Sequence, residues 1–145
     1  MRWRNIPIPE ANLVSLLLGI VLHLIIPWRI FPKPWIGHAV GWPVAIAGIG
    51  LMGWAVSEVR QIYVEEPTKL ITTGPYALSR NPMYVAWTKL QLGVSFVVNT
   101  AWPVVFLIGA ILYTHFFVVP REERDLERRF ENEYRRYRKD VRRYL

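Results

Sequence analysis

The sequence predicts an all-α protein: an integral membrane bundle of about four transmembrane helices, followed by an amphipathic helix in the cytoplasm. Three observations support this fold class. The 145 residues are 52% hydrophobic and include seven tryptophans, which is too apolar for an ordinary soluble domain of this size. The apolar residues are gathered into long runs. The positive charges fall between and after those runs.

Four apolar runs are candidate membrane helices. Residues 12–28, 35–57 and 100–120 lack Lys, Arg, Asp and Glu, whereas residues 83–98 form a shorter run that contains Lys89. A helix needs roughly 20 apolar residues to cross a bilayer, and about 17 are tolerated. We therefore expect four spans. The first run does not end in a small-residue cleavage site, so we interpret it as a retained span rather than a signal peptide.

The positive charges predict the orientation of the bundle. The connections after the first and third runs contain only Arg29 and Lys33, whereas ten Lys or Arg residues follow Pro120 and three lie in residues 58–82. Because Lys and Arg favour cytoplasmic segments, we expect both termini and residues 58–82 in the cytoplasm. We expect the inner membrane of a prokaryote rather than the endoplasmic reticulum. Tryptophans near the expected helix ends suit membrane interfaces: Trp3, Trp28, Trp35 and Trp102.

The composition excludes several classes of partner. The net charge of +7 is concentrated in the tail beside a membrane, which favours contact with the lipid bilayer over nucleic-acid binding. The chain has no cysteine, so it forms no disulfide and no cysteine-based metal site. Its three histidines are scattered along the chain. We therefore expect no metal and no nucleic-acid partner.

The chain reads as one domain, residues 1–145. Its expected parts are a first helical hairpin (11–57), a cytoplasmic segment (58–82), a second hairpin (83–119) and a cytoplasmic tail helix (120–145).

One glycine motif in the first hairpin points to packing rather than to a nucleotide. Residues 48–53 match G-x-G-x-x-G, but the dinucleotide motif needs a preceding strand, and here it lies inside an apolar run. Gly37, Gly41, Ala45 and Gly48 recur at spacings of four, four and three. Small residues at this spacing let membrane helices approach closely, so we expect a helix contact on this face.

The tail predicts an amphipathic helix that begins at Pro120. Proline and the acidic residues Glu122, Glu123 and Asp125 suit the first turn of a helix. An apolar stripe then follows three–four spacing. Its members are Leu126, Phe130, Tyr134, Tyr137, Val141 and Tyr144. The stripe either lies on the membrane interface or covers a molecule bound at the cytoplasmic face. The two roles are compatible with each other.

The segment TTGPYALSRNPMY, residues 72–84, combines turn residues with polar and aromatic side chains. Gly74 and Pro75 predict a turn, and Pro82 favours the start of the next helix. Four polar residues then share one face of that helix, which should point to protein or to a water-filled cavity. They are Tyr84, Thr88, Gln91 and Ser95. We expect Arg80 and Asn81 at the cytoplasmic mouth of this polar seam.

Two motifs resemble one family. GPYALSRNPMY, a hydrophobic hairpin and EERDLERRFENEYRRY are similar to isoprenylcysteine carboxyl methyltransferases and their phospholipid methyltransferase relatives, over about residues 61–141. The matching positions are Gly74, Tyr76, Arg80, Pro82, Tyr84, Glu122, Glu123, Leu126, Phe130, Glu133, Tyr134 and Tyr137.

This resemblance implies S-adenosyl-L-methionine as the cofactor, held at the cytoplasmic helix ends beneath the tail. The implied cofactor-binding residues are Gln61, Thr68, Lys69, Leu70, Ile71, Tyr76, Asn81, Pro82, Met83, Tyr84 and Glu122. The implied catalytic residues are Arg80, Asn81, Tyr84 and Glu122.

The chemistry of the cofactor suits these side chains. Tyr76 and Tyr84 can hold its sulfonium by cation–π attraction, and Arg80 can pair with its carboxylate. Glu122 suits the ribose hydroxyls or the α-amino group.

Three positions depart from the family pattern. Asn81 replaces the commoner histidine and cannot become a cation. Glu131 replaces a glycine, so we expect a continuous helix there. Val118 stands where isoprenylcysteine enzymes have an arginine that contacts the acceptor, and Arg121 is the nearest basic residue.

We therefore expect methyl transfer to a lipophilic or amphipathic acceptor at the cytoplasmic membrane face. An isoprenylcysteine carboxylate, a phospholipid amine, an isoprenoid and a small thiol all remain open as acceptors. Two alternatives are a non-catalytic membrane scaffold or lipid-binding subunit of the same architecture, and a membrane reductase.

Overall fold

The computed structural model describes residues 10–65 and 69–145, with the backbone alone for residues 62–65. Trp3 and Thr68 lie outside the described residues. The described part is all-helical, as predicted. Its elements are α1 (Glu10–Ile25), α2 (Pro34–Glu65), the short 3₁₀ helix η2 (Gly74–Ala77), α3 (Pro82–Val97), α4 (Trp102–Tyr113), the π-helical turn η3 (Thr114–Val118) and α5 (Val119–Asp140).

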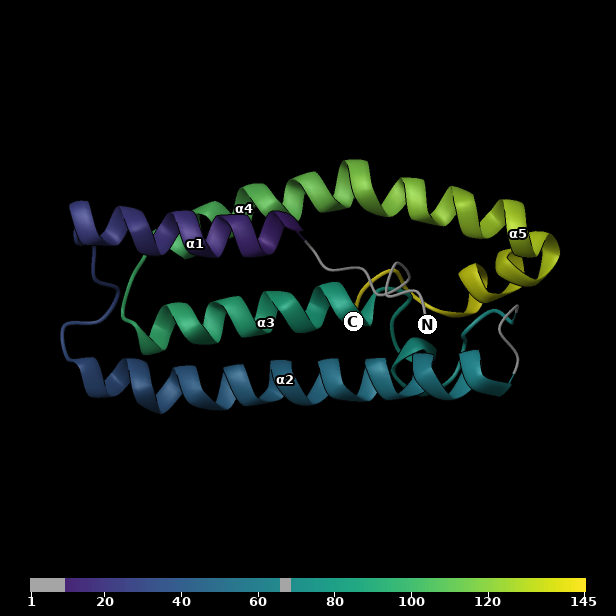
Figure 1. The fold of residues 1–145 in the computed structure, drawn as a ribbon, viewed down its shortest axis with the longest axis horizontal. Helices are drawn as coiled ribbons and strands as arrows, with labels where there is room; N and C mark the ends of the chain where they lie inside the picture. The colour runs from purple at the N-terminus through teal and green to yellow at the C-terminus, as the bar shows by residue number, and fades with distance from the viewer. Residues whose placement is uncertain (1–9, 66–68) are drawn as a thin grey trace.

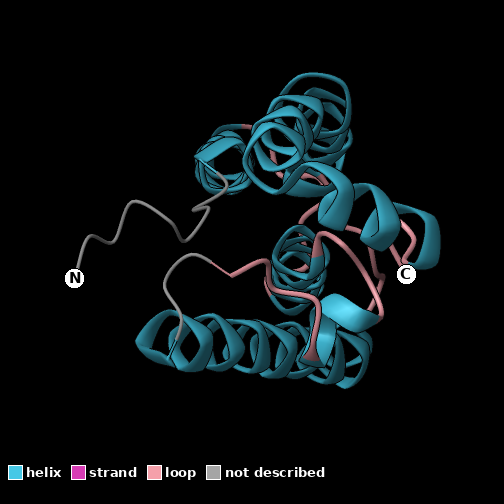
Figure 2. Ribbon diagram, turned by 90° about the vertical axis from the view of Figure 1, so that its right-hand side faces the viewer, coloured by secondary structure: helices cyan, strands magenta, loops and turns pink. Residues whose placement is uncertain are grey.

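The helices run side by side along the long axis of the molecule (Figure 1). Helix α2 packs along α3, and α1 packs along α4, while α3 also contacts α1 and α4. The run from α4 through α5 extends beyond the end of α3 and then turns back (Figure 1). Figure 2 views this end, where the loop segments gather among the helices.

The contact between α2 and α3 depends on glycine, as the sequence predicts. A Cβ atom at Gly41 would lie 2.7 Å from the carbonyl oxygen of Gly93, and one at Gly48 would lie 2.7 Å from the backbone nitrogen of Leu90. Such spaces admit only hydrogen, so the two backbones approach to a distance that larger residues forbid. The predicted packing role of the small-residue face is confirmed. Gly50, in contrast, has nothing within 4 Å of its would-be Cβ.

These two environments give a stability prediction. Gly41→Ala should destabilise the protein, because its methyl group meets the backbone of α3 and that backbone cannot yield. Gly50→Ala should stabilise it by up to about 1 kcal/mol, because alanine is the better helix former. Thermal unfolding in detergent measures both. If Gly41→Ala is as stable as Gly50→Ala, the α2–α3 packing described here is wrong.

Two helical stretches are long and apolar enough to cross a membrane, Pro34–Gln61 and the run that begins at Trp102. Helices α1 and α3 each have 16 residues, which at 1.5 Å per residue gives about 24 Å, less than the roughly 30 Å of a bilayer core. Two spans are thus supported, and the predicted total of four stays a prediction. The outward faces of the helices are apolar, with many exposed Leu, Ile, Val and Trp side chains.

The polar face of α3 points into the protein. Gln91 and Ser95 are 1% exposed. The side-chain amide of Gln91 donates to the Ser15 hydroxyl (2.7 Å) and to the Pro103 carbonyl (3.0 Å). Because polar groups are expensive to leave unpaired in an apolar bundle, these bonds tie α3 to α1 and to the start of α4. The predicted inward orientation is confirmed.

Asn99 closes the end of the bundle opposite the loop-rich end. Its side-chain oxygen accepts hydrogen bonds from the backbone N–H groups of Ile30 (3.0 Å) and Phe31 (2.8 Å). Its amide donates to the Phe31 carbonyl (3.0 Å). Asparagine tolerates the left-handed backbone that this position requires, with φ of 56°. The two connections at this end are therefore fixed to each other.

The tail helix does not begin at Pro120, which corrects the sequence prediction. The backbone stays helical from α4 through η3 into α5, with φ/ψ of −61°/−46° at Thr114 and −57°/−42° at Val119. Proline cannot donate an N–H and clashes with the preceding turn, and the wider π turn just before it absorbs this misfit. Glu122 consequently lies on a continuous helix, so its presence is not explained by a free helix N-terminus.

The predicted continuous helix at Glu131 is wrong. Glu131 has φ of 41° and ψ of −112°, which breaks α5. The break turns the rest of the tail back across the middle segment, and there Tyr134 and Tyr137 pack against Leu70. The helix also ends at Asp140, so the last members of the predicted stripe, Val141 and Tyr144, lie in a non-helical segment.

Glycine should relieve the strain at this break. Glu131→Gly is expected to raise the free energy of unfolding by about 1 kcal/mol, because this backbone conformation is strained for every residue except glycine. Glu133 is the matched control: it is exposed and helical, two residues away. Glu133→Gly should lower the free energy of unfolding by about 1 kcal/mol. Denaturant titration in detergent compares the two, and changes of the same sign would contradict the kink.

Candidate functional site

A pocket of about 570 Å³ lies at the loop-rich end of the molecule, between the segment that precedes α3 and the inner face of α5. We call residues 69–81 the motif loop and residues 141–145 the strap. The pocket is lined by Val59, Lys69, Leu70, Ile71, Tyr76, Arg80, Asn81, Pro82, Met83, Tyr84, Glu122, Glu123, Asp125, Leu126, Arg129, Phe130, Tyr134 and Tyr137.

The start of the motif loop is anchored to α2 by Glu58, a residue that sequence reasoning missed. The Thr73 hydroxyl donates to the Glu58 carboxylate. Gly74 then turns with φ of 58°, and a Cβ atom there would lie 2.6 Å from the same carboxylate. Glycine therefore serves both the left-handed turn and the close approach. Pro75 follows as the second residue of η2, which presents Tyr76 to the pocket.

Arg80 is committed to a buried charge pair. Its Nη1 lies 3.0 Å from Oε1 of Glu123, and both side chains are 9% exposed. The same nitrogen donates to the Tyr134 hydroxyl at 3.3 Å. The Nε atom of Arg80 is buried and has no hydrogen-bond partner among the described residues. Arg80 thus has Nη1 engaged by Glu123 and Tyr134, while its buried Nε has no partner among the described residues.

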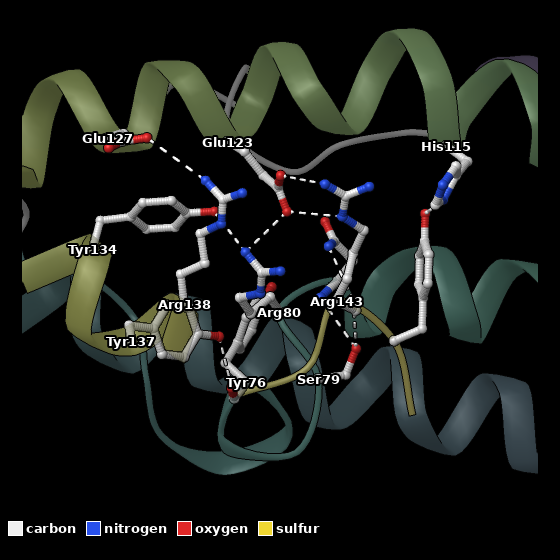
Figure 3. Close-up of polar contacts among 12 residues, drawn as sticks. Tyr76, Ser79, Arg80, His115, Glu123, Glu127, Tyr134, Tyr137, Arg138 and Arg143 are labelled. Carbon is white, nitrogen blue, oxygen red and sulfur yellow. Dashed lines mark hydrogen bonds and ion pairs between the residues drawn. The ribbon is translucent and has the colours of Figure 1, made fainter. Parts of the chain in front are cut away.

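Glu123 is held from both sides (Figure 3). Besides Arg80, it accepts two hydrogen bonds from Arg143 of the strap, Nε to Oε1 at 3.1 Å and Nη2 to Oε2 at 2.7 Å. Paired, hydrogen-bonded charges are the form in which a carboxylate tolerates burial. The sequence places Glu123 in the acidic motif, but nothing in the local pattern around Arg143 identifies it as a partner.

Tyr84 and Glu122 meet at the pocket wall. The Tyr84 hydroxyl donates to Oε1 of Glu122 at 2.8 Å. Glu122 lies beyond the apolar stretch, which ends at Val119. Burial raises the pKa of its carboxyl above the ordinary value, the hydrogen bond from Tyr84 opposes this, and the nearby Asp125 and Glu123 add to the rise. The two residues come from motifs 38 positions apart, and the structure brings them together.

The strap lies against the motif loop. The backbone N–H of Arg80 donates to the Arg142 carbonyl (2.9 Å). The Arg143 carbonyl accepts from the Asn81 side-chain amide (3.1 Å) and from the Ser79 hydroxyl (3.3 Å). Asn81 therefore uses its amide donor to hold the strap.

Two tyrosines of α5 cover the motif loop. The Tyr137 hydroxyl donates to the Tyr76 carbonyl at 2.7 Å, and Tyr134 and Tyr137 form an apolar cluster with Leu70. Burial raises the pKa of both phenols above the ordinary value. Both hydroxyls stay protonated at physiological pH; that of Tyr137 donates to the Tyr76 carbonyl, and that of Tyr134 accepts from Arg80.

Most of the sequence-predicted site residues line the pocket. They are Lys69, Leu70, Ile71, Tyr76, Arg80, Asn81, Pro82, Met83, Tyr84 and Glu122. Gln61 is exposed and does not line it, and Thr68 lies outside the described residues. Val118 and Arg121 do not line it either. The functional role of each residue remains a prediction. Within the described residues, no group of three or more His, Asp or Glu side chains could hold a metal ion.

Comparison with known families identifies the chain. Comparison with curated proteins and with solved structures gives no match. A family model described as phospholipid methyltransferase matches residues 37–133, about two thirds of the chain. The matched range includes the motif loop, the hairpin of α3 and α4, and the Glu122–Glu123 pair, and it ends before the strap. The chain therefore belongs to the phospholipid methyltransferase family of membrane methyltransferases.

Proposed function

We propose that this chain transfers a methyl group from S-adenosyl-L-methionine to a lipophilic or amphipathic acceptor at the cytoplasmic face of a membrane. The observation that supports this most strongly is the pocket itself. It joins both family motifs in one cavity through the Tyr84–Glu122 hydrogen bond. Its volume is within the range of about 300–1,000 Å³ that is typical of small-molecule sites.

The chemistry of the pocket fits this cofactor. Leu70, Ile71, Met83, Leu126 and Phe130 supply an apolar surface suited to adenine. Glu122 and Asp125 supply carboxylates for a ribose diol or an ammonium group. The buried, unpartnered Nε of Arg80 supplies a donor for the amino-acid carboxylate. The residues present thus offer partners for the ribose, ammonium and carboxylate groups of the cofactor and an apolar surface for its adenine ring.

Each wall residue has a distinct proposed task. S-adenosyl-L-methionine, when bound, supplies an electrophilic methyl group on a cationic sulfur. Tyr84 and Tyr76 offer aromatic faces to that cation, and Glu122 favours positive charge close to Tyr84. Glu123 orients Arg80, and Asn81 holds the strap. The folded-back part of α5 covers the motif loop and keeps water from the reacting groups.

The acceptor should arrive from the bilayer. Exposed apolar side chains cover the outward faces of α1, α2 and α4, so lipid is the natural neighbour of the bundle. In the arrangement we propose, residues 1–145 form one domain with four spans, and the motif loop and α5 lie on the cytoplasmic side. The basic residues of the tail then face the anionic leaflet.

Binding of S-adenosylhomocysteine to the full chain in detergent tests the proposal. Isothermal titration calorimetry should show saturable binding, and labelled methyl groups should move from S-adenosyl-L-methionine to one of four probes: a phosphatidylethanolamine, a prenylcysteine, an isoprenoid or a small thiol. Absence of binding at millimolar ligand, by protein shown to be folded, would overturn the proposal and favour the non-catalytic scaffold.

A further inference from the structure

A polar pair lies beside the pocket, on the side of the membrane helices. Nδ1 of His115 and the hydroxyl of Tyr144 are 3.2 Å apart, and their rings lie 5.7 Å centroid to centroid (Figure 3). His115 belongs to the π-helical turn η3. Such turns are rare and are frequent at functional sites. The proposed function assigns no task to either residue.

The strap delivers Tyr144 to this position. The carbonyls of Arg142 and Arg143 accept hydrogen bonds from the motif loop, and the guanidinium of Arg143 pairs with Glu123. Tyr144 is the next residue along the chain. Because its neighbours are fixed at both backbone and side chain, its ring is held against His115 rather than swinging freely.

The pair also borders the Tyr84–Glu122 wall. Burial raises the pKa of the Tyr144 phenol, the nearby Arg143 opposes this, and the carboxylates of Glu123 and Glu122 add to the rise. The Tyr84 hydroxyl of α3 interacts electrostatically with Tyr144 as well. The charged and titratable groups around the pair thus come from α3, α5 and the strap, and they include the carboxylates of Glu122 and Glu123 beside the guanidinium of Arg143.

Aromatic side chains next to His115 are exposed, and in the membrane arrangement that we propose they face lipid. Tyr113, Phe116 and Phe117 are 50%, 63% and 56% exposed. His115 lies four residues before the apolar stretch ends at Val119, about 6 Å along the helix. This is the depth at which aromatic side chains meet lipid head groups. A head group entering from the bilayer would therefore meet His115 on its way to the Tyr84–Glu122 wall.

We propose that His115, oriented by Tyr144, is the general base that takes a proton from the ammonium head group of an aminolipid acceptor. This inference rests on the proposed function. With the Tyr144 oxygen accepting from Nδ1–H, the lone pair of Nε2 is available for the proton. Histidine suits this task because it exchanges protons near neutral pH.

The proton transfer is necessary for an amine and not for other acceptors. Alkylammonium groups have a pKa of about 10, so the nitrogen has no lone pair at neutral pH. His115 accepts one proton. The freed lone pair then forms the nitrogen–carbon bond to the methyl group, and the electrons of the broken carbon–sulfur bond stay on sulfur. A carboxylate or a thiolate already has its lone pair and would need no base.

His115→Ala tests the inference, with His38→Ala as the matched control because His38 is exposed on α2. The probe is dioleoyl phosphatidylethanolamine in mixed micelles with labelled S-adenosyl-L-methionine. His115→Ala should slow methyl transfer about 100-fold, the lower range for a general base. S-adenosylhomocysteine affinity should stay the same. The ratio of the wild-type rate to the His115→Ala rate should fall between about pH 7 and pH 9.5, because at high pH the lipid amine loses its proton without a base from the protein. His38→Ala should match the wild type.

Two further measurements separate the possible failures. Calorimetry of dihexanoyl phosphatidylethanolamine with the S-adenosylhomocysteine complex reports acceptor binding without turnover, and it should be similar in wild type and His115→Ala. Tyr144→Phe should show a smaller loss of rate that narrows with pH in the same way. Wild-type protein that fails to bind S-adenosylhomocysteine overturns the proposed function. Wild-type protein that binds it but neither binds nor methylates the aminolipid overturns only this inference, as does a deficit that is absent or independent of pH.

Discussion

Replacing Glu123 with alanine should lower the free energy of unfolding by about 3–5 kcal/mol, the cost of removing one partner from a buried charge cluster. The Arg80 side chain is 9% exposed and lies 3.0 Å from this carboxylate. Without it, the guanidinium would remain buried beside Tyr134 with no opposite charge. Arg143 would lose two hydrogen bonds, and the strap would lose its side-chain anchor. Denaturant titration of the full chain in detergent measures the loss.

Glu127 is the matched control on the same helix. It also lies near two arginines, 2.8 Å from Arg135 and 3.9 Å from Arg138, but their side chains are 63% and 52% exposed. Exposed ion pairs contribute about 0–1 kcal/mol, so Glu127→Ala should be nearly neutral. Equal losses in the two variants would show that Glu123 is solvated and that the Arg80–Glu123–Arg143 cluster does not hold the site together.

Glu122→Gln is the second substitution with a large expected effect. It keeps the shape of the side chain and removes the negative charge at the pocket wall. We expect binding of S-adenosylhomocysteine to weaken by about tenfold or more, because a hydrogen bond to a charged group contributes about 1.5–3 kcal/mol. Tyr84→Phe should weaken it less, since the carboxylate remains but loses the hydroxyl that orients it. Calorimetry gives both affinities.

The control for this pair of variants is Glu133→Gln, which removes an exposed carboxylate from the same helix. It should bind like the wild type. Thermal unfolding establishes that each variant is folded at the temperature of the titration. Wild-type affinity in both Glu122→Gln and Tyr84→Phe would place the ligand elsewhere and leave the pocket without its proposed occupant.

The parts of the structure that follow local patterns were predictable from the sequence. Gly41 and Gly48 indicate a close helix contact, because their spacing along the sequence places them on the same face of a helix. Gln91 and Ser95 indicate an inward face for the same reason. The two family motifs indicated a shared cavity, and Tyr84 and Glu122 do meet there.

The parts that depend on distant pairings were not predictable. Arg80 was expected to be open to a ligand carboxylate, but Glu123 occupies its Nη1. Arg143 looks like any other basic residue of the tail until the fold brings it to Glu123. A guanidinium attracts a carboxylate wherever the chain brings one near, and no periodicity encodes which one that will be.

The errors at Pro120 and Glu131 have a common cause. Rules for single residues predict a helix start at a proline and continuity at a glutamate. In the structure, a π turn absorbs the proline, and a strained backbone at Glu131 is maintained by the packing of Tyr134 and Tyr137 on Leu70. Tertiary contacts outweigh local preference at both positions.

The unbroken helical backbone from Trp102 to Phe130 has a mechanical consequence. In the membrane arrangement that we propose, one helical stretch carries both the exposed aromatic residues that would contact acyl chains and the carboxylate that meets α3. A bilayer of unmatched thickness tilts such a helix, and tilting slides Glu122 relative to Tyr84. Under the proposed function, the length of the surrounding lipid tails would therefore adjust the geometry of the Tyr84–Glu122 pair, and the host membrane rather than the polypeptide would set that length.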